Sequence, residues 1–154
     1  MASVVNTIKI LTVIDCQTLI NEYPNASTSE SSPTGISLSN LKKTIYMVTS
    51  DPDELSGQAS DNLEIGAHQG DTITWRATSL SLDTDLQAEF YEFRFRGGDR
   101  NLITDPMIVG HDIWMSFVQA DKGYLTYDWK FKILSRRGDV LGCFYWDPRI
   151  TIVG

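Results

Sequence analysis

The sequence lacks the features that mark membrane, nucleic-acid-binding and secreted proteins. No apolar run approaches the roughly 20 residues that a membrane-spanning helix needs. Basic residues are in deficit, with 13 Lys and Arg against 20 Asp and Glu, so nucleic acid and anionic membrane surfaces are not expected partners. The amino terminus has no basic segment followed by a long apolar one, so no usual secretion signal is apparent and a cytoplasmic protein is expected.

Cysteine and histidine are also scarce. A chain of 154 residues forms a sizeable core without a disulfide, so we expect Cys16 and Cys143 to be reduced and mostly buried. Two histidines, His68 and His111, are too few for an imidazole-based metal site without help from carboxylates. No nucleophile elbow, phosphate-binding glycine loop or dinucleotide fingerprint occurs, which predicts a protein that is not an enzyme.

Alternation of apolar and polar residues over short segments is what the sequence has in abundance. The segment 124–134 is the clearest case, with Tyr127 and Trp129 on one side and Lys130 and Lys132 on the other. After the first strand, Asp15 can cap one short helix that Pro24 prevents from extending. We therefore predict a single domain over residues 1–154, an all-β antiparallel β-sandwich, jelly-roll or Ig-like, of about eight strands with one short helix.

Residues 25–39 form the longest segment without a strand or helix pattern. They are rich in Ser, Thr, Pro and Gly and are too polar to supply a core face. A loop of this length in a small domain is either mobile or functional.

Carboxylates gather in two predicted turns. Asp83 and Asp85 lie in the first turn, and Asp99, Asn101 and Asp105 lie in the second. Calcium takes six to eight oxygen ligands, so Asp83, Asp85 and Asp105 are candidate ligands of a calcium ion if the two turns meet. The alternative is that these side chains form an ordinary solvated surface, because acidic turns are common in soluble β proteins.

Aromatic residues divide into two groups. Trp75 and Trp129 fall on predicted core faces, whereas Trp146 lies near a strand end, where its ring could stack on the apolar face of a sugar. Packing in the core is the alternative for Trp146 as well. Polar loop side chains would bind the sugar hydroxyls, and the candidate ligand-binding residues are Asp83, Asp85, Asp99, Asn101, Trp146 and Asp147.

Four segments in order along the chain resemble the AidA/PixA inclusion body family of bacteria. They are residues 10–15 (ILTVID), 32–36 (SPTGI), 70–81 (GDTITWRATSLS, with Thr84 and Asp85 just after) and 144–153 (FYWDPRITIV). The resemblance implies a small non-enzymatic bacterial protein associated with quorum-regulated virulence, symbiosis or cytoplasmic inclusions. With only four methionines, the chain departs from the methionine-rich members, which argues against storage through methionine.

Two functions compete at this point. The first is a lectin-like module that binds carbohydrate through its loops, with calcium as a possible cofactor. The alternative is a self-associating structural or stress protein that forms inclusions, because strand edges of an open sandwich pair readily and homodimers are the commonest oligomers. The expected location is the cytoplasm, including inclusions, with release that does not use a standard signal peptide.

Overall fold

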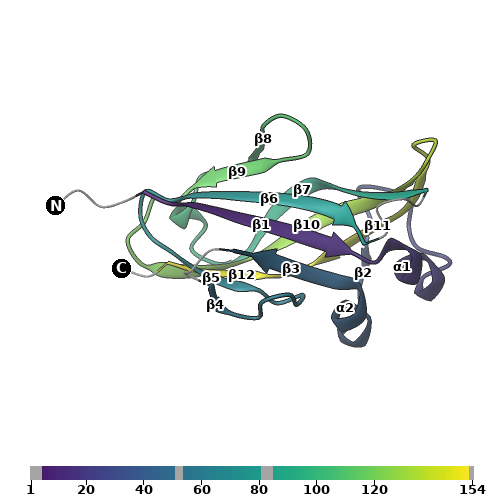
Figure 1. Cartoon of the computed structure of the whole chain (residues 1–154), viewed down its shortest axis with the longest axis horizontal. Helices are drawn as coiled ribbons and strands as arrows, with labels where there is room; N and C mark the ends of the chain where they lie inside the picture. The colour runs from purple at the N-terminus through teal and green to yellow at the C-terminus, as the bar shows by residue number, and fades with distance from the viewer. Residues whose placement is uncertain (1–4, 51–53, 81–84, 153–154) are drawn as a thin grey trace.

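The computed structural model describes residues 5–50, 54–80 and 85–152 and shows two β-sheets stacked face to face (Figure 1). The elements in chain order are β1 (Thr7–Ile14), α1 (Cys16–Glu22), β2 (Thr34–Gly35), α2 (Leu38–Thr44), β3 (Ile45–Thr49), β4 (Glu54–Ser56), β5 (Glu64–Ala67), β6 (Thr72–Ser79), β7 (Leu86–Gly98), η1 (Arg100–Leu102), β8 (Met107–Ile108), β9 (Trp114–Phe117), β10 (Gly123–Ser135), β11 (Val140–Trp146) and β12 (Arg149–Ile152).

The first sheet has the strand order β3-β1-β6-β9-β8, and the second has the order β2-β11-β10-β12-β5-β4, with β7 paired to β10. Three pairs are parallel, namely β1 with β6, β11 with β2 and β12 with β5. Strands β1 and β6 can be parallel because a long connection joins them, which forms β3 at the edge of the first sheet and then β4 and β5 in the second. The prediction of an all-β protein is confirmed, the wholly antiparallel arrangement was wrong, and a jelly-roll or Ig-like order stays unconfirmed.

The core lies between the sheets and is built around aromatic rings. Trp75 of β6 and Trp129 of β10 are buried, with ring centroids 5.6 Å apart in an edge-to-face arrangement. The Trp75 indole N–H donates a hydrogen bond to the Tyr127 hydroxyl at 3.2 Å, which satisfies a polar group that would otherwise be costly to bury. The predicted core positions of both tryptophans are confirmed, because alternation along each strand turns them to the same side.

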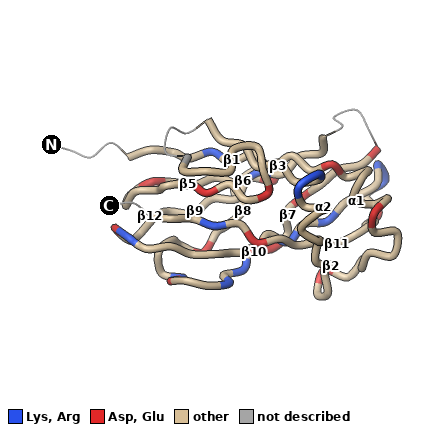
Figure 2. The backbone as a smooth tube through the Cα atoms, turned by 90° about the horizontal axis from the view of Figure 1, so that it is seen from below, with Lys and Arg blue, Asp and Glu red and all other residues tan. Residues whose placement is uncertain are grey.

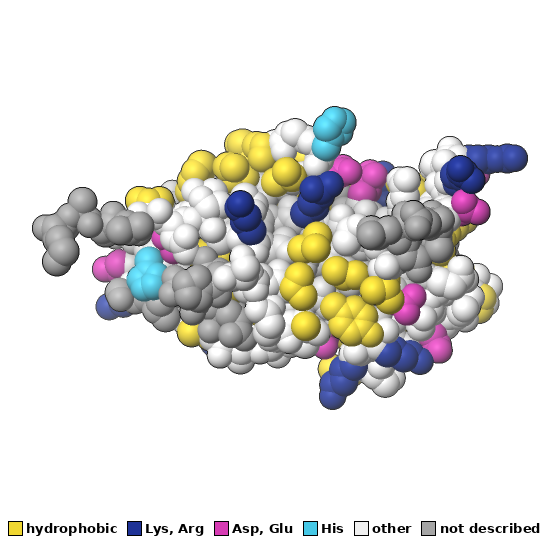
Figure 3. All heavy atoms as spheres, viewed as in Figure 1, with side chains coloured by type: hydrophobic (Ala, Val, Ile, Leu, Met, Phe, Trp, Pro, Cys, Tyr) yellow, Lys and Arg dark blue, Asp and Glu magenta, His cyan; other side chains and the backbone are white. Residues whose placement is uncertain are grey.

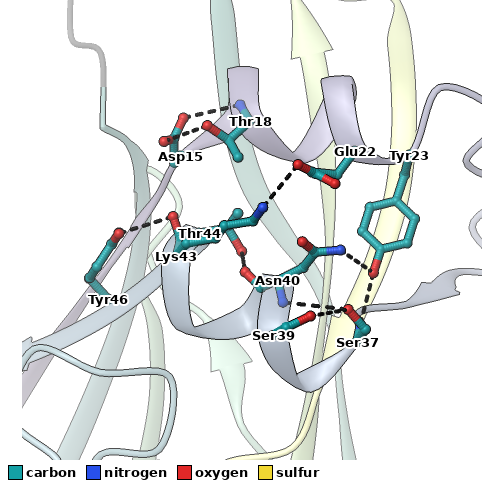
Figure 4. A network of polar contacts seen from close by, with 10 residues as sticks. All are labelled: Asp15, Thr18, Glu22, Tyr23, Ser37, Ser39, Asn40, Lys43, Thr44 and Tyr46. Atoms are coloured by element: carbon teal, nitrogen blue, oxygen red, sulfur yellow. Dashed lines mark hydrogen bonds and ion pairs between the residues drawn. The ribbon is translucent and has the colours of Figure 1, made fainter.

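Two short helices close one end of the molecule (Figure 1). Helix α1 begins after Asp15, whose carboxylate accepts hydrogen bonds from Thr18, and an ion pair of 2.9 Å between Glu22 and Lys43 joins it to α2 (Figure 4). The cap and position of α1 are confirmed. Helix α2 was missed, although its cap Ser37 accepts a hydrogen bond from the Asn40 amide, because the serine-rich composition around it favoured a loop.

Both cysteines are free and buried, as predicted. Burial raises the pKa of the Cys16 thiol to about 11 and also raises the pKa of Cys143. A thiol whose pKa is raised holds little thiolate at neutral pH, so neither residue has the properties of a reactive cysteine.

Charged residues of both signs are interspersed along the backbone (Figure 2). Acidic residues outnumber basic ones, in agreement with the net charge of -7. Within the described part of the chain, neither α-helix has the length and apolar character that crossing a membrane requires.

Candidate functional site

The two predicted acidic turns lie at opposite ends of β7. Asp85 immediately precedes this strand and Asp99 immediately follows it, and its 13 residues extend over about 40 Å at about 3.3 Å per residue. One calcium ion therefore cannot bind Asp85 and Asp105 together, and Asp83 lies outside the described residues. The described residues contain no group of three or more His, Cys, Asp or Glu side chains placed to hold a metal ion; a calcium cofactor stays a prediction.

Each described turn carboxylate has a local partner instead. Asp85 lies 3.5 Å from an Arg136 side-chain nitrogen in the β10–β11 turn. Asp99 caps η1 by accepting a hydrogen bond of 2.9 Å from the Asn101 amide, and Asp105 lies 3.9 Å from Arg100. These contacts assign the second turn a structural role and leave no shared sugar site between the two turns.

The interpretation of Trp146 as a ligand-stacking residue was wrong. Its side chain is 3% exposed, and its indole N–H donates a hydrogen bond of 3.0 Å to the Asp61 carbonyl. The ring contacts Phe90 and Phe131 in the core, because Trp146 is the cross-strand partner of buried Trp129. The next residue, Asp147, is exposed and lies close enough to Asp128 to raise its pKa.

The outer face of the first sheet carries apolar side chains, and both helices lie beyond one end of it (Figures 1 and 3). Cross-strand neighbours join these residues, since Leu11 pairs with Val48 and Val13 pairs with Tyr46. An open groove of about 650 Å³ crosses the face and is lined in part by Leu11, Val48 and Ile113. We call this surface the apolar face. Its members form two groups, Leu11, Val13, Tyr46 and Val48 on β1 and β3, and Met115 and Phe117 on β9, with the outer residues Thr72, Thr74 and Arg76 of β6 between them.

The outer edges of the first sheet are protected against strand pairing. At the β3 edge, the Met47 amide donates to the Ser60 carbonyl, and the Ala59 amide donates to the Met47 carbonyl, both at 2.8 Å. The Gln58 side chain binds the amide and the carbonyl of Thr49 at the same edge. At the other edge, β8 is only two residues long. Self-association of this sheet is therefore better served by its face than by the edges that the sequence suggested.

The outer face of the second sheet is charged. Its cross-strand pairs place Arg94 beside Asp128 and Glu92 beside Lys130, and an ion pair joins Lys130 to Glu92. Arg96 also approaches Asp128, with Nε 3.3 Å from Oδ1. We call this surface the charged face; its members are Glu89, Glu92, Arg94, Arg96, Asp128, Lys130 and Lys132.

A serine-rich loop of residues 25–33 is fastened over part of the charged face. The Cys143 amide donates to the Ser27 carbonyl at 2.7 Å, and the Tyr91 hydroxyl donates to the Glu30 carbonyl at 2.8 Å. The Glu30 carboxylate also lies 2.8 Å from Lys132 Nζ, and this hydrogen bond raises the pKa of Lys132. The loop thus covers a surface, which sequence composition alone did not show.

Beyond the loop, β2 pairs with β11 and brings Gly35 against Tyr145. A Cβ at position 35 would lie 2.9 Å from the Tyr145 hydroxyl oxygen, so any larger residue there would displace the Tyr145 side chain. Between residues 31–33 and the sheet lies a polar pocket of about 270 Å³. Its lining residues are Ser31, Ser32, Pro33, Arg94, Arg96, Asp128, Lys130 and Tyr145.

Two stacked sheets, one with apolar groups on its outer face and the other with a charged face partly under a loop, define a small two-sheet β protein. Residues 6–112 match the sequence model of the PixA inclusion body protein family, and the chain belongs to this family. The resemblance seen in the sequence is thereby confirmed.

A solved structure supports the same fold. The crystal structure of an inclusion body protein (PixA) from Burkholderia cenocepacia J2315 is similar to this chain with a TM-score of 0.87 and 20% sequence identity, covering 99% of this chain and 98% of that one. At this identity the likeness concerns the fold alone. No curated protein matches the chain in sequence.

Proposed function

We propose that this protein is a non-enzymatic, self-associating protein whose copies assemble into inclusions through the apolar face. The observation that carries the proposal is the group of apolar side chains on the outer face of the first sheet, where Leu11 is 36% and Phe117 is 50% exposed. Exposed apolar side chains grouped on one face of a sheet are typical of association sites. Membership of an inclusion body family supports assembly of like chains as the form that this association takes.

The size of the apolar face suits a reversible contact between two copies. Five strands spaced about 4.8 Å apart and rising about 3.3 Å per residue present a sheet face on the order of 500 Å², of which the β6 row is polar. A stable interface of standard size buries about 800 Å² on each partner. The apolar face with some of its rim therefore supports a dimer of moderate affinity, in which the same patch of each copy meets across a twofold axis.

Charge regulates this contact. Lys9 and Arg76 line the groove on the apolar face, and the whole chain carries a net charge of -7. Like-charged copies repel one another at low ionic strength, and salt screens this repulsion while leaving the apolar attraction intact. Moderate salt should accordingly strengthen self-association.

The test is light scattering after size exclusion over a dilution series of the full chain, with Leu11→Lys as the disrupting variant. Leu141 of β11 is 37% exposed, so Leu141→Lys adds the same charge at a site of matched exposure outside the apolar face. We expect Leu11→Lys to weaken dimerisation by about tenfold or more, which corresponds to about 1.4 kcal/mol, and Leu141→Lys to leave it unchanged. A chain that stays monomeric at every concentration, or equal effects of the two variants, would refute the proposal.

The lectin-like interpretation loses the site on which it stood, because Trp146 is buried and the two acidic turns lie at opposite ends of β7. Carbohydrate binding by those residues is not proposed again. The polar pocket of the charged face is a different location with its own chemistry.

A further inference from the structure

Asp128 is the central feature of the polar pocket. Its side chain is 3% exposed, and its Oδ1 accepts no hydrogen bond from the described residues. Arg96 Nε lies 3.3 Å from this oxygen as an ion pair but without the alignment of a hydrogen bond. A buried carboxylate oxygen without a hydrogen bond is costly, and such exceptions in native proteins call for a specific explanation.

Two arginines of β7 lie near this carboxylate, next to a β-bulge. Strand β10 pairs Tyr127 with Phe95 and Thr126 with Gly97, so Arg96 is the extra residue of the bulge. Arg94 and Arg96 are two residues apart, so ordinary alternation places them on the same face of β7, and both line the pocket. Bulges commonly re-aim side chains at functional sites.

The cations of the pocket are not all neutralised. Lys130 is paired with Glu92, and Arg96 is paired with Asp128. Arg94 forms no ion pair within 4.0 Å with any carboxylate of the described residues, although it lies beside Asp128 in the sheet. The pocket therefore offers one unpaired guanidinium, which is a bidentate donor for a carboxylate or phosphate.

Fold stability does not explain why an aspartate occupies this position. Burial raises the pKa of Asp128 above its ordinary value, and nearby Asp147 raises it further, while Arg96 opposes the shift. The surroundings as a whole thus disfavour the ionised form that a purely stabilising ion pair would require. Residues that cost stability are retained most often where they serve binding or catalysis.

We propose that this pocket binds a small hydroxylated anion, such as a hexuronate or a sugar phosphate. The anionic group pairs with Arg94, and a hydroxyl group of the same ligand donates a hydrogen bond to Asp128 Oδ1. Ser31, Ser32 and Tyr145 line the pocket and supply further hydroxyl partners.

Size and charge narrow the ligand class. A volume of about 270 Å³ equals about nine water molecules at about 30 Å³ each, which suits a ligand of monosaccharide size. A plain inorganic anion would leave Asp128 Oδ1 without a donor and would be repelled by the carboxylate. A neutral sugar would leave Arg94 unpaired, so the ligand needs both an anionic group and a hydroxyl group.

The experiment is isothermal titration calorimetry of the full chain with four probes, namely glucuronate, glucose 6-phosphate, glucose and inorganic phosphate. At least one of the two acidic sugars should bind more tightly than glucose and phosphate by about tenfold, because only the acidic sugars fill both halves of the pocket. If glucose bound as tightly as the acidic sugars, the contact of the anionic group with Arg94 would be refuted. If phosphate bound as tightly, the hydrogen bond from a ligand hydroxyl to Asp128 would be refuted. Absence of binding by both acidic sugars would overturn the proposal.

Two variants locate the binding. Arg94→Gln should weaken the acidic sugar by about tenfold or more, whereas Arg137→Gln, which removes the same charge from an exposed turn residue, should have no effect. Asp128→Asn should weaken the acidic sugar while leaving phosphate unchanged or bound more tightly. Equal effects of Arg94→Gln and Arg137→Gln would overturn the assignment.

Ligand binding does not depend on the proposed self-association. The same titrations on Leu11→Lys, which removes the assembly contact, should give unchanged affinity, since Leu11 lies on the opposite outer face. Failure of one proposal is therefore distinguishable from failure of the other.

Discussion

The outer faces of the two sheets share one core but differ in cover and in charge. On the first sheet, Leu11 and Phe117 are exposed, and apolar side chains gather in patches on this side of the molecule (Figure 3). On the second sheet, charged residues form cross-strand pairs, and the serine-rich loop lies over Lys132 and Cys143. The apolar face is open and suits a large flat partner, whereas the charged face is partly enclosed and suits a small polar one.

The difference shows how a two-sheet protein can separate two kinds of contact. Assembly through an open sheet face needs area, and the first sheet supplies it without a covering helix in the described elements. A small polar ligand needs enclosure and desolvated donors, and the loop and the bulged strand β7 supply both on the second sheet. Each face can then be altered without altering the other.

The largest expected effect is a loss of stability from a substitution in the core that both sheets share. Phe131 is buried between the sheets and contacts Phe144 and Trp146. Phe131→Ala should reduce the free energy of unfolding by about 3–5 kcal/mol, because it leaves a cavity in the shared core. Urea denaturation followed by tryptophan fluorescence measures the change; a loss below about 1 kcal/mol would show that the two sheets do not depend on this packing.

Thiol reactivity sharpens the comparison between core and covered face. Burial raises the pKa of Cys16 from 9.0 to about 11. At neutral pH its thiolate fraction is therefore about 100-fold smaller than that of a thiol with the ordinary pKa. Iodoacetamide labelling read by mass spectrometry should leave Cys16 unmodified in the native protein and label it after unfolding. Rapid labelling of Cys16 in the native protein at pH 8 would contradict its burial in the core.

Loosening the serine-rich loop should affect only the second sheet. Glu30→Gln removes the carboxylate that pairs with Lys132 at 2.8 Å, a partly exposed contact worth up to about 1 kcal/mol. Labelling of Cys143, whose amide binds the Ser27 carbonyl, should increase severalfold while labelling of Cys16 does not change. Equal increases at both thiols would indicate global destabilisation instead of loop release.

The smallest expected effect concerns Asp128. A raised pKa means that the folded state binds the proton more tightly than the unfolded chain, so this group destabilises the fold progressively as pH rises from the ordinary aspartate pKa to the raised value, and by a constant amount above it. Asp128→Asn should therefore increase stability at neutral pH, by less than about 1 kcal/mol, and the difference should vanish below the ordinary aspartate pKa. Urea midpoints at neutral and acidic pH measure it, and a destabilised variant at neutral pH would contradict the shift.

Much of the fold followed from local sequence signals. Alternation placed Trp75 and Trp129 in the core, and Asp15 marked the start of α1. Helix α2 and the burial of Trp146 did not follow, because serine-rich composition resembles a loop and a residue near a strand end can point either way. The pocket at Asp128 lies between residues 31–33 and the second sheet, and no local pattern reveals this contact between distant parts of the chain.

By itself, the sequence determined the all-β class, the buried thiols, the aromatic core and the family. Only the tertiary structure decided that Asp85 and Asp105 lie far apart, that the serine-rich loop covers the charged face and that the apolar face stays open. The physical reason is that side chains alternate between the two faces of a strand, so the sequence pattern predicts which of them share a face. What lies over that face depends on pairings between residues distant in the chain, such as Lys132 with Glu30, and these form only when the chain folds.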